Sequence, residues 1–371
     1  MDIVINVIPI LGKLTGVGKY TYYVTENLVK KFNENYYFFV HGTILRDYKN
    51  LLFFKKKKRE KIKKIINKLP FLKSNLRKFI DLISRMNDRI YDVYFEPNFV
   101  PFDLKSKKLV STVHDLSFIL YPEWHPEERV EFITNGFIKK TLKSDIIITP
   151  SNFIRNQLID EFPSLEDRVF AIHLGVDHEI FNPFTLNEPL NFDIPPKYIL
   201  FVGSIEPRKN LINLLKAYNM LPKSIKEEYN LLLAGFEGWK NKEIMDLIKS
   251  SQKYIRYVGY VPENVLAELY RRASIFIYPS LYEGFGLPPL EAMACGCPVI
   301  VTKVASIPEV CEDAAVYIEN PRDPEEIAFR IQQLLEDREL YITMKERALK
   351  HVEKFSWEKT AEQHYKLFKC I

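Results

Sequence analysis

The chain has 371 residues, of which 47% are hydrophobic and 27% charged, and its net charge is +5. This composition is typical of a soluble globular protein. No apolar run reaches the length of about 18 residues that crosses a bilayer, so we exclude a membrane-spanning protein. A chain of this length is too long for one ordinary core, and we predict two domains.

The N-terminal residues MDIVINVIPI begin with an acid and have no basic stretch, so we expect a buried strand there rather than a secretion signal. The four cysteines lie at positions 295, 297, 311 and 370. Their spacing matches neither a C-x2-C metal site nor a disulfide framework. Together these features favour a reducing, cytoplasmic location.

In the first half of the chain, short apolar segments predict strands, and helical stretches separate them. Strands are expected at 2–10, 36–41, 91–96, 108–113 and 146–149. Helices are expected at 18–32 and 126–142, among others. This alternation, with strands that are almost continuously apolar, favours a doubly wound parallel sheet.

The first half also contains a strongly basic segment, residues 55–83. Between positions 55 and 78 there are 12 Lys or Arg and one Glu, a local charge of +11. Apolar residues recur at helical spacing on both sides of Pro70. One interpretation is a peripheral contact with an anionic membrane surface, and the other is a helix that packs on its own domain. Because no RNA-binding motif accompanies the charge, we expect no nucleic-acid partner.

A proline-rich stretch without periodicity, residues 182–196, separates this pattern from a second one. In the second half, strands are expected at 198–202, 229–234, 255–258, 274–278 and 298–302, and helices at 210–218 and 263–272. We therefore predict an α/β protein with a Rossmann-like domain at 1–184, a linker at 185–196 and a second Rossmann-like domain at 197–354.

The most informative segment follows the predicted strand at 274–278. Glu283 and Glu291 lie eight positions apart, and Gly284 and Gly286 lie between them. Glycine permits backbone geometry closed to other residues, and prolines at 288 and 289 suit the first turn of a helix. A strand, a glycine loop and a helix N-terminus together favour a phosphate, while carboxylates accept hydrogen bonds from sugar hydroxyls. The combination suggests a nucleotide-sugar site. The alternative is that Glu291 only complements the helix dipole and Glu283 is solvated.

Further candidates follow other strands, where ligands bind in open α/β sheets. Arg208 and Lys209 follow the strand at 198–202, and His114 follows the strand at 108–113. No G-x-S-x-G motif accompanies His114, so a hydrolase is not indicated. Gly16 and Gly18 form a weak G-x-G loop after the first strand. The alternatives are that Arg208 and Lys209 are solvated surface cations, that His114 is a packing residue, and that Gly16 and Gly18 form a simple turn.

The segment SLYEGFGLPPLEAMACGCPVI, with Glu283-x7-Glu291, resembles the E-x7-E signature of the retaining glycosyltransferases of family 4. Six further segments match that family in order: GVGKY, VHDLSF, PSNFIR, LGVD, FVGSIEPRKNL and FSWEKTA. HDLSFILYPEWHPEERV and GSIEPRKNL are most similar to mannosyltransferases of bacterial polysaccharide and O-antigen assembly. The resemblance implies the GT-B fold, in which two Rossmann-like domains face across a cleft and a C-terminal helix, here 355–371, returns to the first domain.

The resemblance also implies residue roles. Glu283 would bind the transferred sugar and Glu291 the ribose. His114 would orient the sugar, and Arg208 and Lys209 would bind the diphosphate. Further donor contacts would come from Gly16, Gly18, Gly259, Tyr260, Phe285, Gly286 and Leu287.

The reaction implied is retaining transfer of a hexose from a nucleoside-diphosphate sugar to a glycan or lipid-linked acceptor. GDP-mannose is the first choice of donor, and UDP-glucose or a related UDP-sugar is the second. Ser204 departs from the family, which often has an arginine after the strand glycine. No D-x-D pair or other metal-ligand spacing is present, so we expect neither a metal nor another cofactor. A UDP-GlcNAc 2-epimerase of the same architecture and a non-catalytic nucleotide-sugar binder remain as alternatives.

Overall fold

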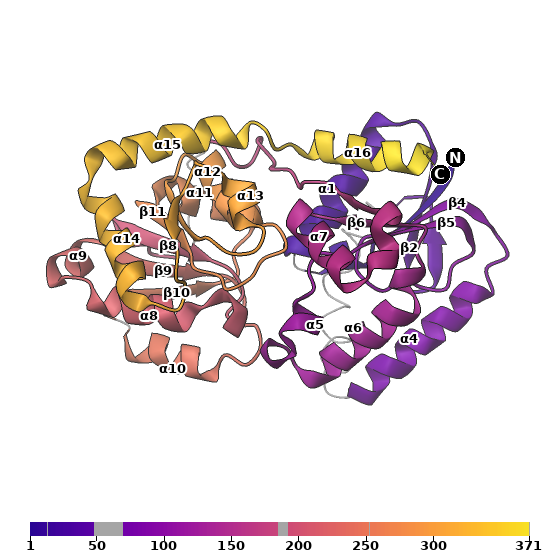
Figure 1. The fold of residues 1–371 in the computed structure, drawn as a ribbon, viewed down its shortest axis with the longest axis horizontal. Helices are drawn as coiled ribbons and strands as arrows, with labels where there is room; N and C mark the ends of the chain where they lie inside the picture. Colours follow the sequence, from indigo (N-terminus) through magenta and orange to yellow (C-terminus); the bar gives the residue numbers. More distant parts are fainter. Residues whose placement is uncertain (13, 48–69, 185–191, 252, 371) are drawn as a thin grey trace.

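The computed structural model describes residues 1–12, 14–47, 70–184, 192–251 and 253–370, and the structural statements below concern these residues. Two α/β halves lie side by side, each built on one sheet (Figure 1). Residues 185–191 of the predicted linker and residues 55–69 of the basic segment lie outside the described residues. No described helix is long and apolar enough to cross a membrane.

The N-terminal half contains a seven-stranded sheet in the order β3-β2-β1-β4-β5-β6-β7, parallel except for the pair β2 and β3. Its strands are β1 Asp2–Asn6, β2 Asn35–Val40, β3 Thr43–Leu45, β4 Tyr91–Glu96, β5 Ser106–Thr112, β6 Ile146–Thr149 and β7 Val169–Ala171. Its α-helices are α1 Gly16–Lys31, α4 Pro70–Arg85, α5 Ser117–Leu120, α6 Glu127–Lys139 and α7 Asn152–Glu161. Short 3-10 helices are η1 Ile8–Leu11, η2 Pro122–Trp124, η3 Thr141–Lys143 and η4 Pro163–Arg168.

The C-terminal half contains a six-stranded, all-parallel sheet in the order β10-β9-β8-β11-β12-β13. Its strands are β8 Tyr198–Val202, β9 Asn230–Ala234, β10 Ile255–Gly259, β11 Ile275–Tyr278, β12 Val299–Thr302 and β13 Val316–Ile318. Its helices are η5 Pro207–Lys209, α8 Leu211–Met220, α9 Lys223–Glu228, α10 Lys242–Ser250, α11 Glu263–Arg272, α12 Leu287–Ala294, α13 Ile307–Cys311, α14 Pro324–Glu336 and α15 Arg338–Val352. The last helix, α16 Trp357–Lys369, lies on the N-terminal half.

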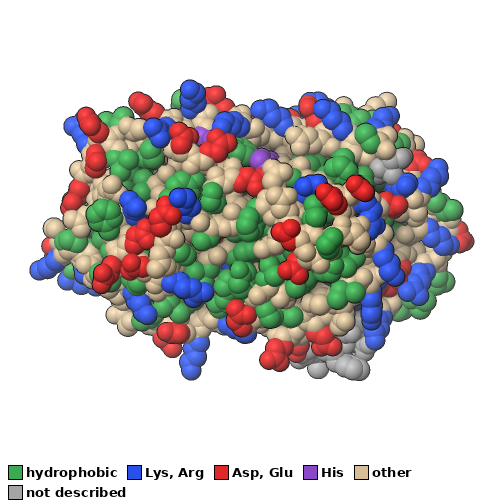
Figure 2. Space-filling view, viewed as in Figure 1, with side chains coloured by type: hydrophobic (Ala, Val, Ile, Leu, Met, Phe, Trp, Pro, Cys, Tyr) green, Lys and Arg blue, Asp and Glu red, His purple; other side chains and the backbone are tan. Residues whose placement is uncertain are grey.

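The apolar segments of the sequence form the cores of both sheets, which confirms the predicted fold class. In β8, for example, no residue is more than 9% exposed. A parallel strand is covered by helices on both faces, so it can bury every side chain. Lys and Arg side chains are interspersed with Asp and Glu over the face of the molecule seen in Figure 2.

The first strand is shorter than the predicted 2–10. It ends at Asn6, and the 3-10 helix η1 follows. The Asn6 side chain causes this turn in part, because its Oδ1 accepts the backbone N–H of Ile8 at 3.1 Å. Pro9 then lies in the first turn of η1, where its missing N–H is tolerated, whereas in a strand interior it would remove a ladder hydrogen bond.

The C-terminal helix returns to the N-terminal half, as predicted. After α15 the chain crosses over, and α16 packs against α1 (Figure 1). The hydroxyl of Tyr20 on α1 lies 2.6 Å from Nε2 of His364, and the ring of Trp357 stacks on Tyr23 with 5.1 Å between centroids. A Cβ on Gly175 would lie 2.2 Å from the backbone nitrogen of Trp357. The LGVD segment therefore needs glycine where the crossing chain passes.

We predict that Trp357→Ala lowers the free energy of unfolding by about 3–5 kcal/mol, the usual cost of truncating a buried tryptophan. Trp357 is 4% exposed and holds the start of α16 on α1 through its stack with Tyr23. Denaturant unfolding measures the change. Phe329→Ala is the control, since Phe329 is 58% exposed, and its effect should stay within about 0.5 kcal/mol. Equal effects of the two variants would show that Trp357 does not anchor the crossing.

Candidate active site

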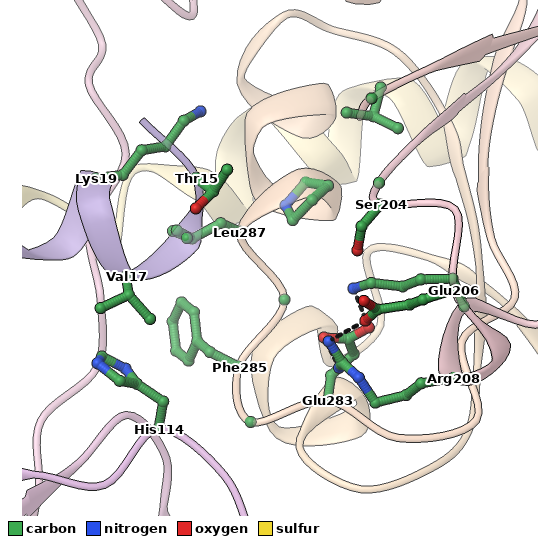
Figure 3. A pocket seen from close by; sticks show the side chains of 18 of the residues that line it. Thr15, Val17, Lys19, His114, Ser204, Glu206, Arg208, Glu283, Phe285 and Leu287 are labelled. Atoms are coloured by element: carbon green, nitrogen blue, oxygen red, sulfur yellow. Dashed lines mark hydrogen bonds and ion pairs between the residues drawn. The ribbon is translucent and has the colours of Figure 1, made fainter. Parts of the chain in front are cut away.

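A cavity of about 390 Å³ lies between the two halves. Its walls come from the carboxyl ends of parallel strands, including the segments after β5, β8, β9 and β11. Figure 3 shows Thr15, Val17, Lys19 and His114 on one side and Ser204, Glu206, Arg208 and Glu283 on the other, with Phe285 and Leu287 between them. This volume lies within the usual range of small-molecule sites, roughly 300–1,000 Å³.

The predicted strand, glycine loop and helix N-terminus are confirmed. β11 ends at Tyr278, and α12 starts at Leu287 with two prolines in its first turn. Gly286 caps this helix with a φ of 119°, a conformation that favours glycine. The hydroxyl of Ser306 donates to the carbonyls of Glu283 at 2.8 Å and Phe285 at 3.0 Å, and so holds the loop in place.

The glycine loop also touches the N-terminal half. A Cβ on Gly284 would lie 1.8 Å from the carbonyl oxygen of His114, so no larger residue fits without moving backbone. The hydroxyl of Ser151 donates to the carbonyl of Gly284 at 2.8 Å and also accepts the N–H of Ile154, which caps α7. Gly284 and the PSNFIR segment therefore join the two halves beside the cavity.

Glu283 is a buried carboxylate held by two cations. Its Oε2 lies 2.8 Å from Nη1 of Arg208, and its Oε1 lies 2.6 Å from Nζ of Lys209. Burial by itself would raise the pKa of Glu283, but Arg208 and Lys209 outweigh it and lower the pKa to about 2. Glu283 is therefore charged at neutral pH.

Glu206 extends this cluster. Its Oε1 lies 3.0 Å from Nη2 of Arg208, so one guanidinium joins two carboxylates. Lys209 also donates to the hydroxyl of Tyr278 at 2.6 Å. The formal charges of Glu206, Arg208, Lys209 and Glu283 cancel, so the cluster orients two cations without adding net positive charge.

Glu291 lies at the other end of the cavity, in an ion pair between the two halves. Lys19 of α1 bonds to Oε1 of Glu291 and lies 3.1 Å from Oε1 of Glu263. Tyr270 donates to Oε2 of Glu291 at 3.2 Å. Burial would lower the pKa of Lys19, but the charges of Glu291 and Glu263 raise it, so Lys19 stays protonated.

His114 is present as the neutral imidazole. Its Nε2 lies 2.7 Å from the carbonyl oxygen of Pro97, which can only accept, so Nε2 carries the proton. Burial lowers the pKa of His114 below its ordinary value. Nδ1 is therefore a hydrogen-bond acceptor at the edge of the cavity.

The other predicted residues divide into two groups. Gly16, Tyr260, Phe285, Gly286 and Leu287 line the cavity. Gly18 and Gly259 are not among the lining residues, because Gly18 is buried within α1 and Gly259 ends β10. The loop predicted at Gly16 and Gly18 is wrong, since α1 already begins at Gly16, two residues before the predicted start at 18. The backbone N–H groups that this loop was expected to present belong instead to the first turn of α1.

Several lining residues were not predicted from the sequence. Lys19 and Glu206 belong to the segments GVGKY and FVGSIEPRKNL, so their position beside predicted residues was the available signal. Three other lining residues lie in the quoted segment HDLSFILYPEWHPEERV: Asp115, His125 and Arg129. Trp239 and Glu263 lie outside every quoted segment and carry no signal of this kind. Among the described residues, no group of three or more His, Cys, Asp and Glu side chains is placed to hold a metal ion.

Two Rossmann-like domains that face across a cavity at their strand ends, with a C-terminal helix returning to the first domain, have the GT-B architecture of glycosyltransferases. Residues 14–180 match the family model "Glycosyltransferase Family 4", and residues 185–351 match the model "Glycosyl transferases group 1". The chain therefore belongs to the family 4 glycosyltransferases and is an enzyme of that class.

Individual relatives agree with this assignment. The O-antigen chain mannosyltransferase B of Escherichia coli is 36% identical over 287 residues, covering 75% of this chain and 74% of the relative. The serotype-specific mannosyltransferase WbdA of E. coli is 33% identical over 276 residues, which cover 71% of this chain but only 33% of that relative. In fold, the chain is similar to Anabaena HepE in complex with UDP-glucose, with a TM-score of 0.71, 15% identity and 100% of both chains covered.

We predict that Glu283 stabilises the protein in a pH-dependent way. Its pKa falls from 4.5 to about 2 on folding, so its contribution is complete above pH 4.5 and is lost as the pH falls towards 2. At pH 7, Glu283→Gln should lower the free energy of unfolding by about 3 kcal/mol, and the difference should shrink between pH 4.5 and 2. Denaturant unfolding across pH measures this. Exposed Glu346→Gln is the control, and a pH-independent difference for Glu283→Gln would contradict the ion-pair assignment.

Proposed function

We propose that the protein transfers mannose from GDP-mannose to a glycan or lipid-linked glycan in surface-polysaccharide assembly, with retention of configuration and without a metal ion. The observation that carries this proposal is the cavity in which Glu283, Arg208 and Lys209 meet the N-terminus of α12. The similarity to O-antigen chain mannosyltransferase B supports the choice of sugar and process.

In this proposal the diphosphate of the sugar donor binds where backbone N–H groups and cationic side chains converge. The bond from C1 of the sugar to a phosphate oxygen breaks, and negative charge grows on the leaving diphosphate. Arg208, Lys209 and the amide end of α12 stabilise that charge, because they are oriented before the reaction begins. The formal charges of Arg208, Lys209, Glu206 and Glu283 sum to zero. The orientation of the two cations, rather than an excess of positive charge, therefore stabilises the leaving diphosphate.

The two glutamates would hold the two sugars of the donor. Each carboxylate has about four acceptor positions. Glu291 uses them for Lys19 and Tyr270, which leaves room for ribose hydroxyls. Glu283 likewise keeps capacity beside Arg208 and Lys209 for a hydroxyl of the transferred hexose. Neutral His114 would accept from another hydroxyl and orient the ring.

Retention needs no basic side chain in this scheme. The acceptor oxygen bonds to C1 on the face from which the phosphate leaves, and the hydroxyl proton passes to the departing phosphate oxygen. Glu283 is unsuited to take this proton, because its pKa of about 2 makes it a weak base. Its role is to orient and to stabilise charge.

A UDP-sugar is the second candidate donor, supported by the fold shared with HepE in complex with UDP-glucose. A UDP-GlcNAc 2-epimerase is a more distant alternative that would act without an acceptor. Product analysis separates the two reactions, because a transferase forms a new glycoside and an epimerase does not.

We predict that GDP-mannose raises the melting temperature of the protein and that EDTA leaves this shift unchanged. A ligand at 100 times its Kd stabilises the folded state by about 2.7 kcal/mol. A thermal-shift panel with GDP-mannose, GDP, UDP-glucose and UDP, each with and without EDTA, measures this. A shift with UDP-sugars alone would replace the proposed donor, and loss of the shift in EDTA would contradict metal independence.

We also propose a peripheral contact with anionic membranes through residues 78–86, which include the end of the basic segment and the last turns of α4. Three apolar side chains share one exposed face of this region at helical spacing: Phe79, Leu82 and Met86, which are 58%, 55% and 72% exposed. Exposed Lys78 and Arg85 flank them. An exposed apolar stripe with cations beside it suits a negatively charged lipid surface.

We predict that the protein sediments with liposomes containing phosphatidylglycerol but not with neutral phosphatidylcholine liposomes. Leu82→Glu should weaken this binding, because it places a negative charge on the apolar stripe. Phe329→Glu is the matched control, since Phe329 is equally exposed but lies on α14 of the other half. Binding that is indifferent to lipid charge would overturn the membrane contact.

A further inference from the structure

One wall of the cavity contains polar groups that the donor contacts above do not use. We call it the His125 wall, and it consists of Asp115, Ser117, His125, Glu206 and Trp239, all of which line the cavity. The first three come from the N-terminal half, and the last two come from loops after β8 and β9. The wall adjoins the donor cluster directly, because Glu206 bonds to Arg208 and Arg208 bonds to Glu283.

The hydrogen bonds of the wall define the state of His125. The Ser117 hydroxyl donates its only proton to Oδ1 of Asp115 at 2.6 Å. Its oxygen lies 2.9 Å from Nε2 of His125, so it must accept from Nε2–H. Burial lowers the pKa of His125, which therefore is neutral at pH 7. Nδ1 is left as an acceptor.

Two acceptor atoms of this wall have no partner among the described residues: Nδ1 of His125 and Oε2 of Glu206. Both residues are well buried, with 5% and 2% of their surface exposed. Leaving a buried polar atom without a partner is destabilising, so two such atoms on residues that line one cavity indicate a ligand that satisfies them.

Trp239 supplies an apolar surface beside these two acceptors. Its Nε1 donates to the carbonyl of Trp124 at 2.7 Å, which holds the indole across the boundary between the halves. The guanidinium of Arg129 lies 4.7 Å from the ring centroid. The indole is partly exposed and lines the cavity, so it can pack against the C–H face of a sugar ring.

We infer that the His125 wall is the acceptor subsite and that it takes a neutral pyranose, two of whose hydroxyls donate to His125 Nδ1 and Glu206 Oε2. This inference rests on the proposed function as a transferase. A phosphate does not suit these two acceptor atoms, because a phosphate dianion has no proton to donate to them and is repelled by the Glu206 carboxylate. The sugar end of an acceptor, rather than a lipid phosphate, therefore lies here.

Two substitutions of His125 distinguish the roles of its two ring nitrogens. His125→Asn keeps an acceptor near the position of Nδ1, whereas His125→Gln keeps a group near Nε2, towards Ser117. We expect His125→Gln to raise the KM for a neutral acceptor roughly tenfold, the effect of one lost hydrogen bond, with less change in kcat. His125→Asn should stay closer to the wild type. The opposite order would overturn the assignment, since a purely structural role of His125 depends on the Ser117 contact.

Trp239 has a matched control in its neighbour. Lys240 donates to the carbonyl of Glu123 at 2.7 Å and so also joins the halves, but it does not line the cavity. We expect Trp239→Leu to raise the acceptor KM roughly tenfold and Trp239→Phe to raise it less, because an aromatic ring remains. Lys240→Met should leave it unchanged. Equal effects of Trp239→Leu and Lys240→Met would mean that only the contact between the halves matters.

The ligand class is tested on the wild-type protein by calorimetry with methyl α-D-mannopyranoside, methyl α-D-glucopyranoside and mannose 6-phosphate, in the presence of GDP. We expect a neutral pyranoside to bind and mannose 6-phosphate to bind more weakly. Binding of the neutral pyranoside should be lost in His125→Gln. Absence of binding by both neutral pyranosides, or tighter binding of the phosphate, would overturn the inference. Release of GDP from GDP-mannose without acceptor is measured separately, so failure of the proposed donor is distinguishable from failure of the acceptor subsite.

Discussion

The contact of one buried carboxylate with two cations organises the candidate active site. Glu283 is charged inside the protein because Arg208 and Lys209 lie within 2.8 Å of its oxygens. The same contact holds both cations in a defined orientation. An isolated buried arginine or lysine would have no compensating negative charge, and its burial would be strongly destabilising. Removing any of the three would leave an uncompensated charge, so the cluster functions as a unit. The formal charges of the cluster with Glu206 cancel. In the proposed reaction, an incoming diphosphate therefore meets oriented hydrogen-bond donors rather than a strong positive field.

The cavity exists only because the two halves meet on several sides of it. Lys19 joins α1 to α11 and α12, Gly284 lies against the backbone of His114, and Trp239 bonds to the backbone of Trp124. Glu309 of α13 accepts the N–H groups of Asn152 and Phe153 at the start of α7. These contacts are polar and specific, and they lie around rather than within the hydrophobic cores. A ligand in the cavity therefore contacts both domains at once, and in the proposed reaction donor and acceptor lie on adjoining walls.

Much of the fold followed from local patterns. Apolar segments predicted the strands β4, β6 and β8 with their observed bounds, and the E-x7-E segment predicted the strand, loop and helix around Glu283. The errors have local physical causes as well. Asn6 and Pro9 end β1 early by hydrogen bonding and by a missing donor, and α1 begins at Gly16 without a loop.

The sequence by itself determined which residues are buried, where the strands end and therefore which side chains stand at the edges of the two sheets, because these properties depend on neighbours a few positions apart. Only the tertiary structure decided the partners of those side chains. Lys19 and Glu291 are separated by 272 positions, and no periodicity relates them. His125, Glu206 and Trp239 form one wall because two independent sheets present their loops to the same space. Such pairings depend on how whole domains pack, and that packing is a sum over many distant contacts that no local pattern contains.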